Sequence, residues 1–197
     1  MMNLERRFVW DVLESHVKED HLRRHCLTVE IALRAYARKW GQDENYWGAV
    51  GALHDVDFEK YPEEHLKHTG EFLSPAGYDK EFIRHILSHD RAYPSEKRDL
   101  LDRTLLACDE TPGFVLACCL VRPGKSLQDM QAKSIMKKMK DKAFARGCDR
   151  EFLTSSAEAL GVPFKEHADF IRVALAEALQ DQRFFNIHLI TDEGVMP

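Results

Sequence analysis

The chain has 197 residues, of which 44% are hydrophobic and 31% charged, and its formal net charge is −5 at pH 7. This length and balance are typical of one globular domain and exclude a disordered chain. No apolar run approaches the roughly 20 residues that span a bilayer, and the N-terminus lacks the apolar stretch of a signal peptide. We therefore expect a cytoplasmic protein without a membrane partner. Five cysteines without a CxxC pair predict reduced thiols, most of them in the core.

Apolar residues recur with helical spacing along nearly the whole chain, and no stretch alternates as a strand does. In the first half this pattern predicts helices over residues 8–17, 22–41 and 43–55. Asp43 is the expected N-cap of the third. A further helix is expected to open at Pro62, because proline is tolerated in a first turn, and to stop near Gly77. The next one carries His85 and His89 at positions i and i+4, where both can share a face.

In the second half a helix over about 101–108 leads into Asp109. Thr111-Pro112-Gly113 is expected to interrupt the chain before a short buried helix over 114–121. Arg122 to Ser126 form a predicted turn, with Ser126 as candidate N-cap of a basic helix. Two more helices are expected over residues 150–160 and 164–180. The sequence thus predicts an all-α, single-domain bundle over 1–183, followed by a tail over 184–197 that packs locally or extends away.

The pair His54-Asp55 offers an imidazole nitrogen and a carboxylate oxygen from adjacent backbone positions. A second histidine and a second aspartate would complete the nitrogen and oxygen shell that suits divalent metals such as zinc, iron, manganese or magnesium. His25 lies early in one predicted helix, the pair ends another, and Asp109 closes a third. Helix ends that meet in space would bring these four side chains together. The alternative is that the histidines are satisfied core residues.

Three segments extend the pattern beyond single residues: Gly51–Asp57, Ile86–His89 and Leu120–Ser126. With the order His, His-Asp, Asp they resemble the HD superfamily of metal-dependent phosphohydrolases, and within it a group of small stand-alone bacterial and archaeal predicted hydrolases. The motif core covers about residues 22–150. The resemblance implies an HD-type helical bundle and a divalent ion (Mn, Fe, Zn, Mg, Co or Ni) whose ligands are His25, His54, Asp55 and Asp109.

Binuclear members of that superfamily recruit two more histidines between the pair and the last aspartate. By resemblance these are His65 and His89, which would bind a second ion. His68 and His85 are expected to be solvated residues. Asp57, two residues after the ligand, could orient or deprotonate a metal-bound water, or it could cap a helix or pair with a nearby lysine.

The chain also departs from some members of the superfamily. Its cyclic dinucleotide phosphodiesterases follow the His-Asp pair with Ile-Gly-Lys and carry a Gly-Tyr-Pro signature. Here Val56-Asp57-Phe58 follows the pair, and no glycine precedes Tyr93-Pro94. These differences argue against cyclic di-GMP as the substrate.

Residues 122–146 contain eight basic side chains and two acidic ones, a local charge of +6 in an acidic chain. Arg122, Lys125 and Lys133 are the candidates for neutralising a substrate phosphate. A solvated helix face is the alternative for this strip. A nucleic-acid partner is not expected, because Phe144 is the only aromatic residue in the strip and the whole chain is acidic.

The resemblance implies a phosphohydrolase that attacks a small phosphorylated compound with a metal-activated water; the cations are compatible with this activity, and a nucleotide is the expected substrate. Two alternatives stay open. One is a catalytically silent helical sensor that keeps the metal, and the other is a nucleic-acid-binding module that uses residues 122–146. The exact substrate, the native metal, the number of ions and the existence of a homo-oligomer are left open by the sequence.

Overall fold

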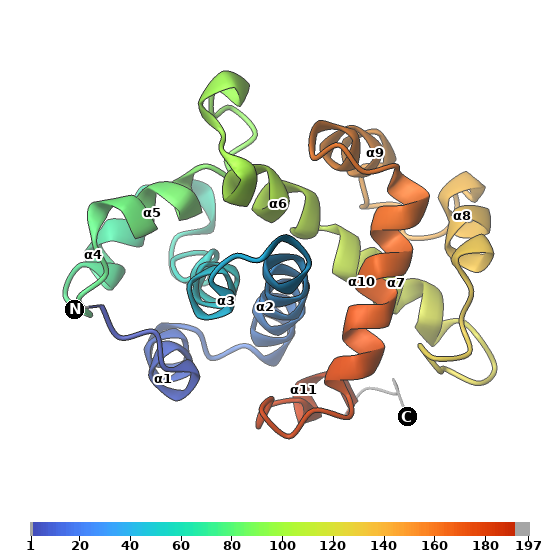
Figure 1. The fold of residues 1–197 in the computed structure, drawn as a ribbon, viewed down its shortest axis with the longest axis horizontal. Coiled ribbons are helices and arrows are strands. Elements are labelled where there is room, and N and C mark those ends of the chain that lie inside the picture. Colours follow the sequence, from blue (N-terminus) through green and yellow to red (C-terminus); the bar gives the residue numbers. More distant parts are fainter. Residues whose placement is uncertain (1, 192–197) are drawn as a thin grey trace. The chain divides into compact units, whose positions relative to one another are not determined.

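The computed structural model describes residues 2–191, and all regular elements within that range are helical. This confirms the all-α class. The chain forms two compact units, Met1–Leu106 and Ala107–Pro197, whose helices are labelled in Figure 1. The prediction of one domain over residues 1–183 with a separate tail stays a prediction. No helix in the described part of the chain is both long and apolar enough to cross a membrane.

The first unit is built from helices of very unequal length. They are α1 (Arg6–His16), α2 (Asp20–Trp40), α3 (Glu44–Leu53), the 3-10 turn η1 (Pro62–Glu64), α4 (Thr69–Leu73), α5 (Lys80–Leu87) and the 3-10 turn η2 (Ser95–Lys97). Helix α6 (Leu100–Cys108) begins in this unit and ends in the second one.

Helices α2 and α3 form an antiparallel hairpin that positions the site, and they lie side by side in Figure 1. Helix α2 ends at Gly41, whose φ of 64° is the left-handed conformation that glycine adopts without strain. As predicted, Asp43 caps α3: its Oδ1 accepts from the backbone N–H groups of Asn45 at 2.9 Å and Tyr46 at 3.0 Å. The short connection therefore places the end of α3 beside the beginning of α2.

The close approach of these two helices depends on Gly51. A Cβ atom at this position would lie 3.0 Å from the Cα atom of Glu30 and 3.0 Å from the carbonyl oxygen of Val29. Both atoms belong to the backbone of α2, so a methyl group could be accommodated only if the helices moved apart.

We therefore expect Gly51→Ala to lower the free energy of unfolding by about 1–3 kcal/mol, the usual cost of overpacking. Gly70→Ala is the matched control, because a Cβ atom there would meet nothing within 4 Å. Urea unfolding followed by circular dichroism measures both. Equal stability of the two variants would show that the α2–α3 contact can widen without cost.

The segment after the His-Asp pair differs from its prediction. A helix from Pro62 to about Gly77 is wrong: η1 ends at Glu64, Leu66 has a φ of 72°, and α4 covers only Thr69–Leu73. The reason is that the backbone N–H of His68 donates to the carboxylate of Asp57 at 3.2 Å, which breaks the helical ladder.

The helix expected to carry both His85 and His89 is shorter than predicted. Helix α5 ends at Leu87, and Ser88 is its C-cap. His89 follows in a turn in which its backbone N–H bonds to the carbonyl of Ile86 at 3.2 Å. The two histidines therefore do not share one helical face, and each has its own surroundings.

The second unit contains α7 (Thr111–Leu120), α8 (Ala132–Lys140), α9 (Arg150–Ala159), α10 (Phe164–Ala178) and α11 (His188–Thr191). Helix α10 packs against α7, α8 and α9, and Figure 1 shows α7 passing behind it and α8 to its right. Four of the five cysteines are buried, as predicted for core thiols: Cys26, Cys108, Cys118 and Cys119.

Two helix boundaries in this unit correct the sequence prediction. Thr111-Pro112-Gly113 does not interrupt the chain but opens α7, since proline is compatible with a first turn. Ser126 is not the cap of the basic helix, because its Oγ accepts from the backbone N–H of Asp129 at 3.1 Å and so closes a separate turn. Helix α8 starts six residues later, with Gln131 as its N-cap.

The predicted tail is partly packed. Phe184, Leu189 and Ile190 are buried, and α11 lies within the tail. Residues 192–197 of the predicted tail lie outside the described residues.

Candidate metal centre

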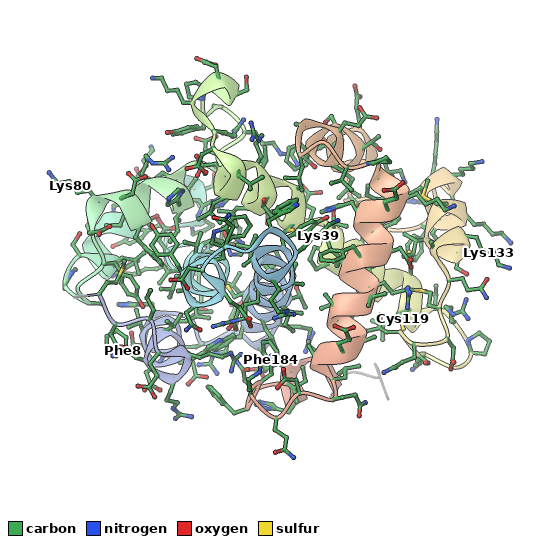
Figure 2. The ribbon with its side chains drawn as sticks, viewed as in Figure 1. Phe8, Lys39, Lys80, Cys119, Lys133 and Phe184 are labelled. Carbon is green, nitrogen blue, oxygen red and sulfur yellow. The ribbon has the colours of Figure 1, made fainter. Side chains whose placement is uncertain are left out.

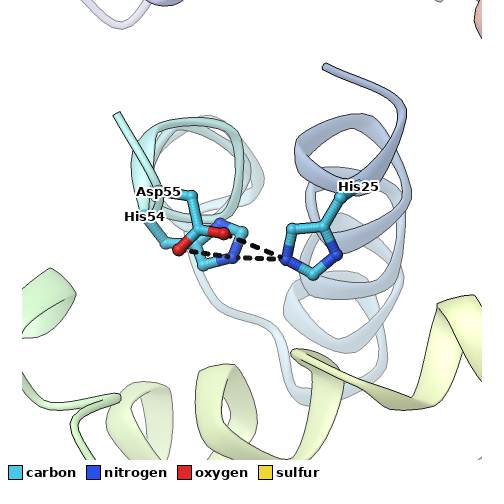
Figure 3. A group of neighbouring side chains, drawn as sticks. All are labelled: His25, His54 and Asp55. Atoms are coloured by element: carbon cyan, nitrogen blue, oxygen red, sulfur yellow. Dashed lines mark hydrogen bonds and ion pairs between the residues drawn. The ribbon is translucent and has the colours of Figure 1, made fainter. Parts of the chain in front are cut away.

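Three of the predicted ligands meet between α2 and α3. His25 lies in the first half of α2, while His54 and Asp55 directly follow the last residue of α3. His25 Nε2 is 3.0 Å from His54 Nε2 and 3.3 Å from Asp55 Oδ2 (Figure 3). His54 is fully buried and Asp55 nearly so. The hairpin thus brings two imidazoles and one carboxylate to one point, and such a group could hold a metal ion.

A second group of ligand type shares Asp55 with the first. His65 Nε2 lies 3.2 Å and His89 Nε2 3.6 Å from Asp55 Oδ1, and the two Nε2 atoms are 3.1 Å apart. His65 comes from the turn after η1 and His89 from the turn after α5. The carboxylate of Asp55 therefore has two histidines near each of two positions that could hold an ion.

The hydrogen-bond partner of Nδ1 determines which nitrogen of each imidazole carries the lone pair. His54 Nδ1 is 2.8 Å from the carbonyl oxygen of Gly51, and His89 Nδ1 is 2.6 Å from that of Ile86. A carbonyl can only accept, so in both rings Nδ1 carries the hydrogen. The Nε2 atom of the neutral ring then has a lone pair, and it is directed at Asp55. Partners of this kind fix the tautomer of metal-binding histidines.

The donor set fits a divalent metal ion. Imidazole nitrogens and the oxygens of a carboxylate converge at each position, and their lone pairs repel one another unless a proton or a metal cation lies between them. Two nitrogen ligands at about 2.0–2.1 Å from one ion, at tetrahedral or right angles, lie about 2.8–3.4 Å apart. The Nε2–Nε2 distances of 3.0 and 3.1 Å agree with this spacing. Imidazole with carboxylate suits the borderline to hard metals named above.

The electrostatics of the centre follow from burial and from these contacts. Burial acts to raise the pKa of Asp55, but the charge of His54 and the close imidazoles of His25, His65 and His89 outweigh it and hold that pKa well below its usual value. Burial acts to lower the pKa of His65, and the carboxylates of Asp55 and Asp57 more than compensate, raising it to about 9. The lowered pKa favours the charged form of the Asp55 carboxylate, which attracts cations.

Asp57 is fully buried, and both of its carboxylate oxygens accept hydrogen bonds. Oδ1 lies 2.8 Å from His65 Nδ1, and Oδ2 accepts from Thr69 Oγ1 at 3.0 Å and from the backbone N–H of His68 at 3.2 Å. The proposed role of Asp57 in handling a water stays a prediction. Its observed role is to hold the turn that carries His65.

One group of titratable side chains in the first unit was not predicted from the sequence. His85 is buried, not solvated, and its Nδ1 lies 2.7 Å from Asp102 Oδ1. Arg84 donates to Asp102 at 2.7 Å, to Asp99 at 2.9 Å and to Glu81 at 3.1 Å. Because a guanidinium already neutralises these carboxylates, we interpret the group as a salt-bridge network rather than as a metal site. Spacing alone gave no signal for it, since Asp102 is 17 residues from His85.

His68 is partly exposed, in line with its prediction. Its Nδ1 lies 3.1 Å from Glu71 Oε1, and its ring stacks on Tyr61 with centroids 3.9 Å apart. It belongs to neither ligand group.

The other predicted site residues belong to the second unit. Asp109 directly follows α6, and its role as a ligand stays a prediction. Arg122 donates to Ser134 Oγ at 3.0 Å and to the carbonyl of Asp129 at 3.4 Å. Lys125 and Lys133 are exposed, and Figure 2 labels Lys133 on α8.

Comparisons with protein-family models, with curated proteins and with solved structures found no match to this chain. The candidate centre therefore rests on its own residues and their geometry.

Proposed function

We propose that this chain is a metal-dependent phosphohydrolase of the HD type that acts on a small phosphorylated compound, with a nucleotide as the expected substrate. The observation that supports it best is the sharing of Asp55 by two ligand groups, His25 with His54 and His65 with His89. Centres with two neighbouring ions are common in enzymes that hydrolyse phosphate esters.

The predicted ligands would form two neighbouring ion positions. His25, His54 and Asp55 would hold one ion, with Asp109 as a further ligand, and Asp55, His65 and His89 would hold a second. A bound divalent ion would lower the pKa of a coordinated water and polarise a phosphate oxygen. Asp55 would keep the two positions together, since its Oδ2 lies near His25 and its Oδ1 near His54 as well as near His65 and His89.

A nucleic-acid partner for residues 122–146 gains no support from the side chains. Phe144, the only aromatic residue of this strip, packs edge-on against Phe114 with ring centroids 5.8 Å apart. The ammonium group of Lys138 lies 4.6 Å from the centroid of the Phe144 ring. These two neighbours already take up part of the surface of this ring on which a base could stack.

The test is a hydrolysis screen. Chelator-treated protein is reloaded separately with Mn²⁺, Co²⁺, Ni²⁺, Zn²⁺, Fe²⁺ or Mg²⁺ and incubated with nucleoside mono- and triphosphates, sugar phosphates and p-nitrophenyl phosphate. We expect phosphate release that depends on the added metal and disappears in Asp55→Asn. Metal binding without turnover of any phosphate ester would instead favour the catalytically silent sensor.

The predicted phosphate contacts can be tested through the exposed lysines. Two divalent ions held by Asp55 and Asp109 would keep a net charge of +2, which a phosphate monoester with nearly two negative charges offsets, so the further phosphates of a nucleotide or a metal-bound hydroxide would need additional cations. We expect Lys125→Ala and Lys133→Ala to raise KM or lower kcat while the melting temperature stays the same, because both side chains are exposed.

Arg122→Ala should have the same kinetic effect, but it also removes hydrogen bonds to Ser134 and Asp129, so its stability must be measured alongside. Unchanged kinetics in all three variants would place the phosphate away from this strip. Lys165→Ala, an exposed lysine of α10 outside the strip, is the control.

A further inference from the structure

Within the two ligand groups, the Nδ1 atoms of His54, His65 and His89 are held in different ways. His54 and His89 bond to backbone carbonyls three residues earlier, at 2.8 and 2.6 Å. The helical turn that carries each of them also fixes its ring. His65 has no such support: it follows the 3-10 turn η1, and its Nδ1 lies 2.8 Å from a side chain, the carboxylate of Asp57.

The same carboxylate also holds the backbone around His65. The next residue, Leu66, has a φ of 72°, a conformation that is strained for any residue with a side chain. Its backbone N–H donates to Asp57, as does that of His68, and Thr69 Oγ1 donates to the same group at 3.0 Å. A fully buried carboxylate is thus the common acceptor for the whole turn over residues 65–69.

We propose that Asp57 is a positioning residue for the second ion: by holding the Nδ1 hydrogen of His65, it directs the Nε2 lone pair of that ring to the position beside Asp55 and His89. This inference rests on the metal centre of the proposed function. It predicts that the two positions depend on Asp57 unequally, because the Nδ1 atom of His65 contacts Asp57, whereas that of His54 contacts the backbone carbonyl of Gly51.

The variant Asp57→Asn tests this positioning role and leaves the charge of Asp55 in place. The amide keeps the size of the carboxylate but has one acceptor oxygen. If that oxygen faces His65, the NH₂ group meets the donating N–H of His68. If the amide is turned round, the NH₂ group meets His65 Nδ1 and forces the hydrogen onto Nε2, which then cannot bind a metal. Either arrangement weakens the second position alone.

The experiment is a titration of chelator-treated protein with Mn²⁺, followed by calorimetry and by electron paramagnetic resonance. Wild type should bind two ions and develop the signal of an exchange-coupled pair. Asp57→Asn should bind the first ion as wild type does and the second about 10–100-fold more weakly, the usual effect of losing a partner of a metal-binding histidine. The coupled signal should be absent at concentrations that saturate wild type.

Two controls exclude a general effect on stability. Asp102→Asn removes another fully buried carboxylate that accepts from a histidine at 2.7 Å, but from His85, outside both ligand groups. Thr69→Val removes one donor to Asp57 and leaves the contact with His65. Both should bind two ions. Thr69→Val could lose the second ion as Asp57→Asn does. In that case anchoring of the turn explains the effect, and the proposed orientation of the His65 ring by Asp57 is wrong.

The remaining outcomes are also decisive. Two ions in Asp57→Asn with wild-type affinity would overturn the role of Asp57 and leave the metal centre standing. A wild-type chain that binds no Mn²⁺, or only one ion, would refute the second position itself. Should Asp57→Asn not fold, ¹⁵N NMR of zinc-loaded wild type decides: His65 must bind through Nε2 and keep its hydrogen on Nδ1, and binding through Nδ1 overturns the inference.

Discussion

Asp55→Asn is expected to abolish binding at both positions of the centre, and with it all metal-dependent hydrolysis. Its Oδ1 lies 3.2 Å from His65 Nε2 and 3.6 Å from His89 Nε2, while its Oδ2 lies 3.3 Å from His25 Nε2. The amide has almost the same shape but no charge. Metal affinity should therefore fall by more than the roughly 100-fold that marks the upper end of changes outside the ligand set.

Single histidine variants provide the comparison for Asp55→Asn. His25→Ala should lose the first ion and His89→Ala the second, whereas Asp55→Asn should lose both. Calorimetric titration with Mn²⁺ or Zn²⁺ measures the number of ions, and circular dichroism checks that the helices remain. An Asp55→Asn protein that keeps one ion at wild-type affinity would show that the carboxylate is not shared.

The largest effect on stability is expected at Glu30, which lies on the face of α2 that meets α1. This side chain is fully buried and accepts from Arg6 Nε at 2.7 Å, from Trp10 Nε1 at 2.7 Å and from Arg34 Nε at 2.8 Å. Glu30→Ala would leave the buried guanidinium of Arg34 and the indole N–H of Trp10 without this acceptor. Breaking a buried ion pair in this way costs about 3–5 kcal/mol.

Asp11→Ala is the matched control for Glu30→Ala. Asp11 pairs with Arg7 one turn earlier on α1 at 3.1 Å, but more than half of each side chain is exposed. Exposed pairs at this spacing contribute about 0.3–0.5 kcal/mol. Urea unfolding should therefore separate the two variants clearly. A loss of less than about 1 kcal/mol in Glu30→Ala would mean that water or a neighbouring group replaces the carboxylate.

Long amphipathic helices and their caps could be predicted from the sequence, because they depend on local residues. Asp43 caps α3 and Gly41 ends α2 as expected. The turn over residues 65–69 could not be predicted, because it is held by Asp57, which lies outside it in the chain. A pattern of apolar residues contains no information about such a side-chain acceptor, so a helix was predicted there.

Some residues of the candidate site could likewise be predicted from local sequence, and others could not. The adjacency of His54 and Asp55, with His25 on the preceding helix, follows from a hairpin whose two helices were recognisable. His65 and His89 were predicted as ligands of a second ion through the resemblance to the HD superfamily. In the structure their Nε2 atoms are 3.1 Å apart. The burial of His85 against Asp102 had no counterpart in the sequence pattern, because it depends on how α5 packs beside the start of α6.

Anomalous diffraction from crystals grown with Mn²⁺ would show whether two ions share Asp55. We expect two anomalous peaks about 3.5–4 Å apart, a typical spacing in two-metal sites. One should lie beside His25 and His54, and the other beside His65 and His89. The absence of any peak beside Asp55 under saturating Mn²⁺ would refute the shared metal centre.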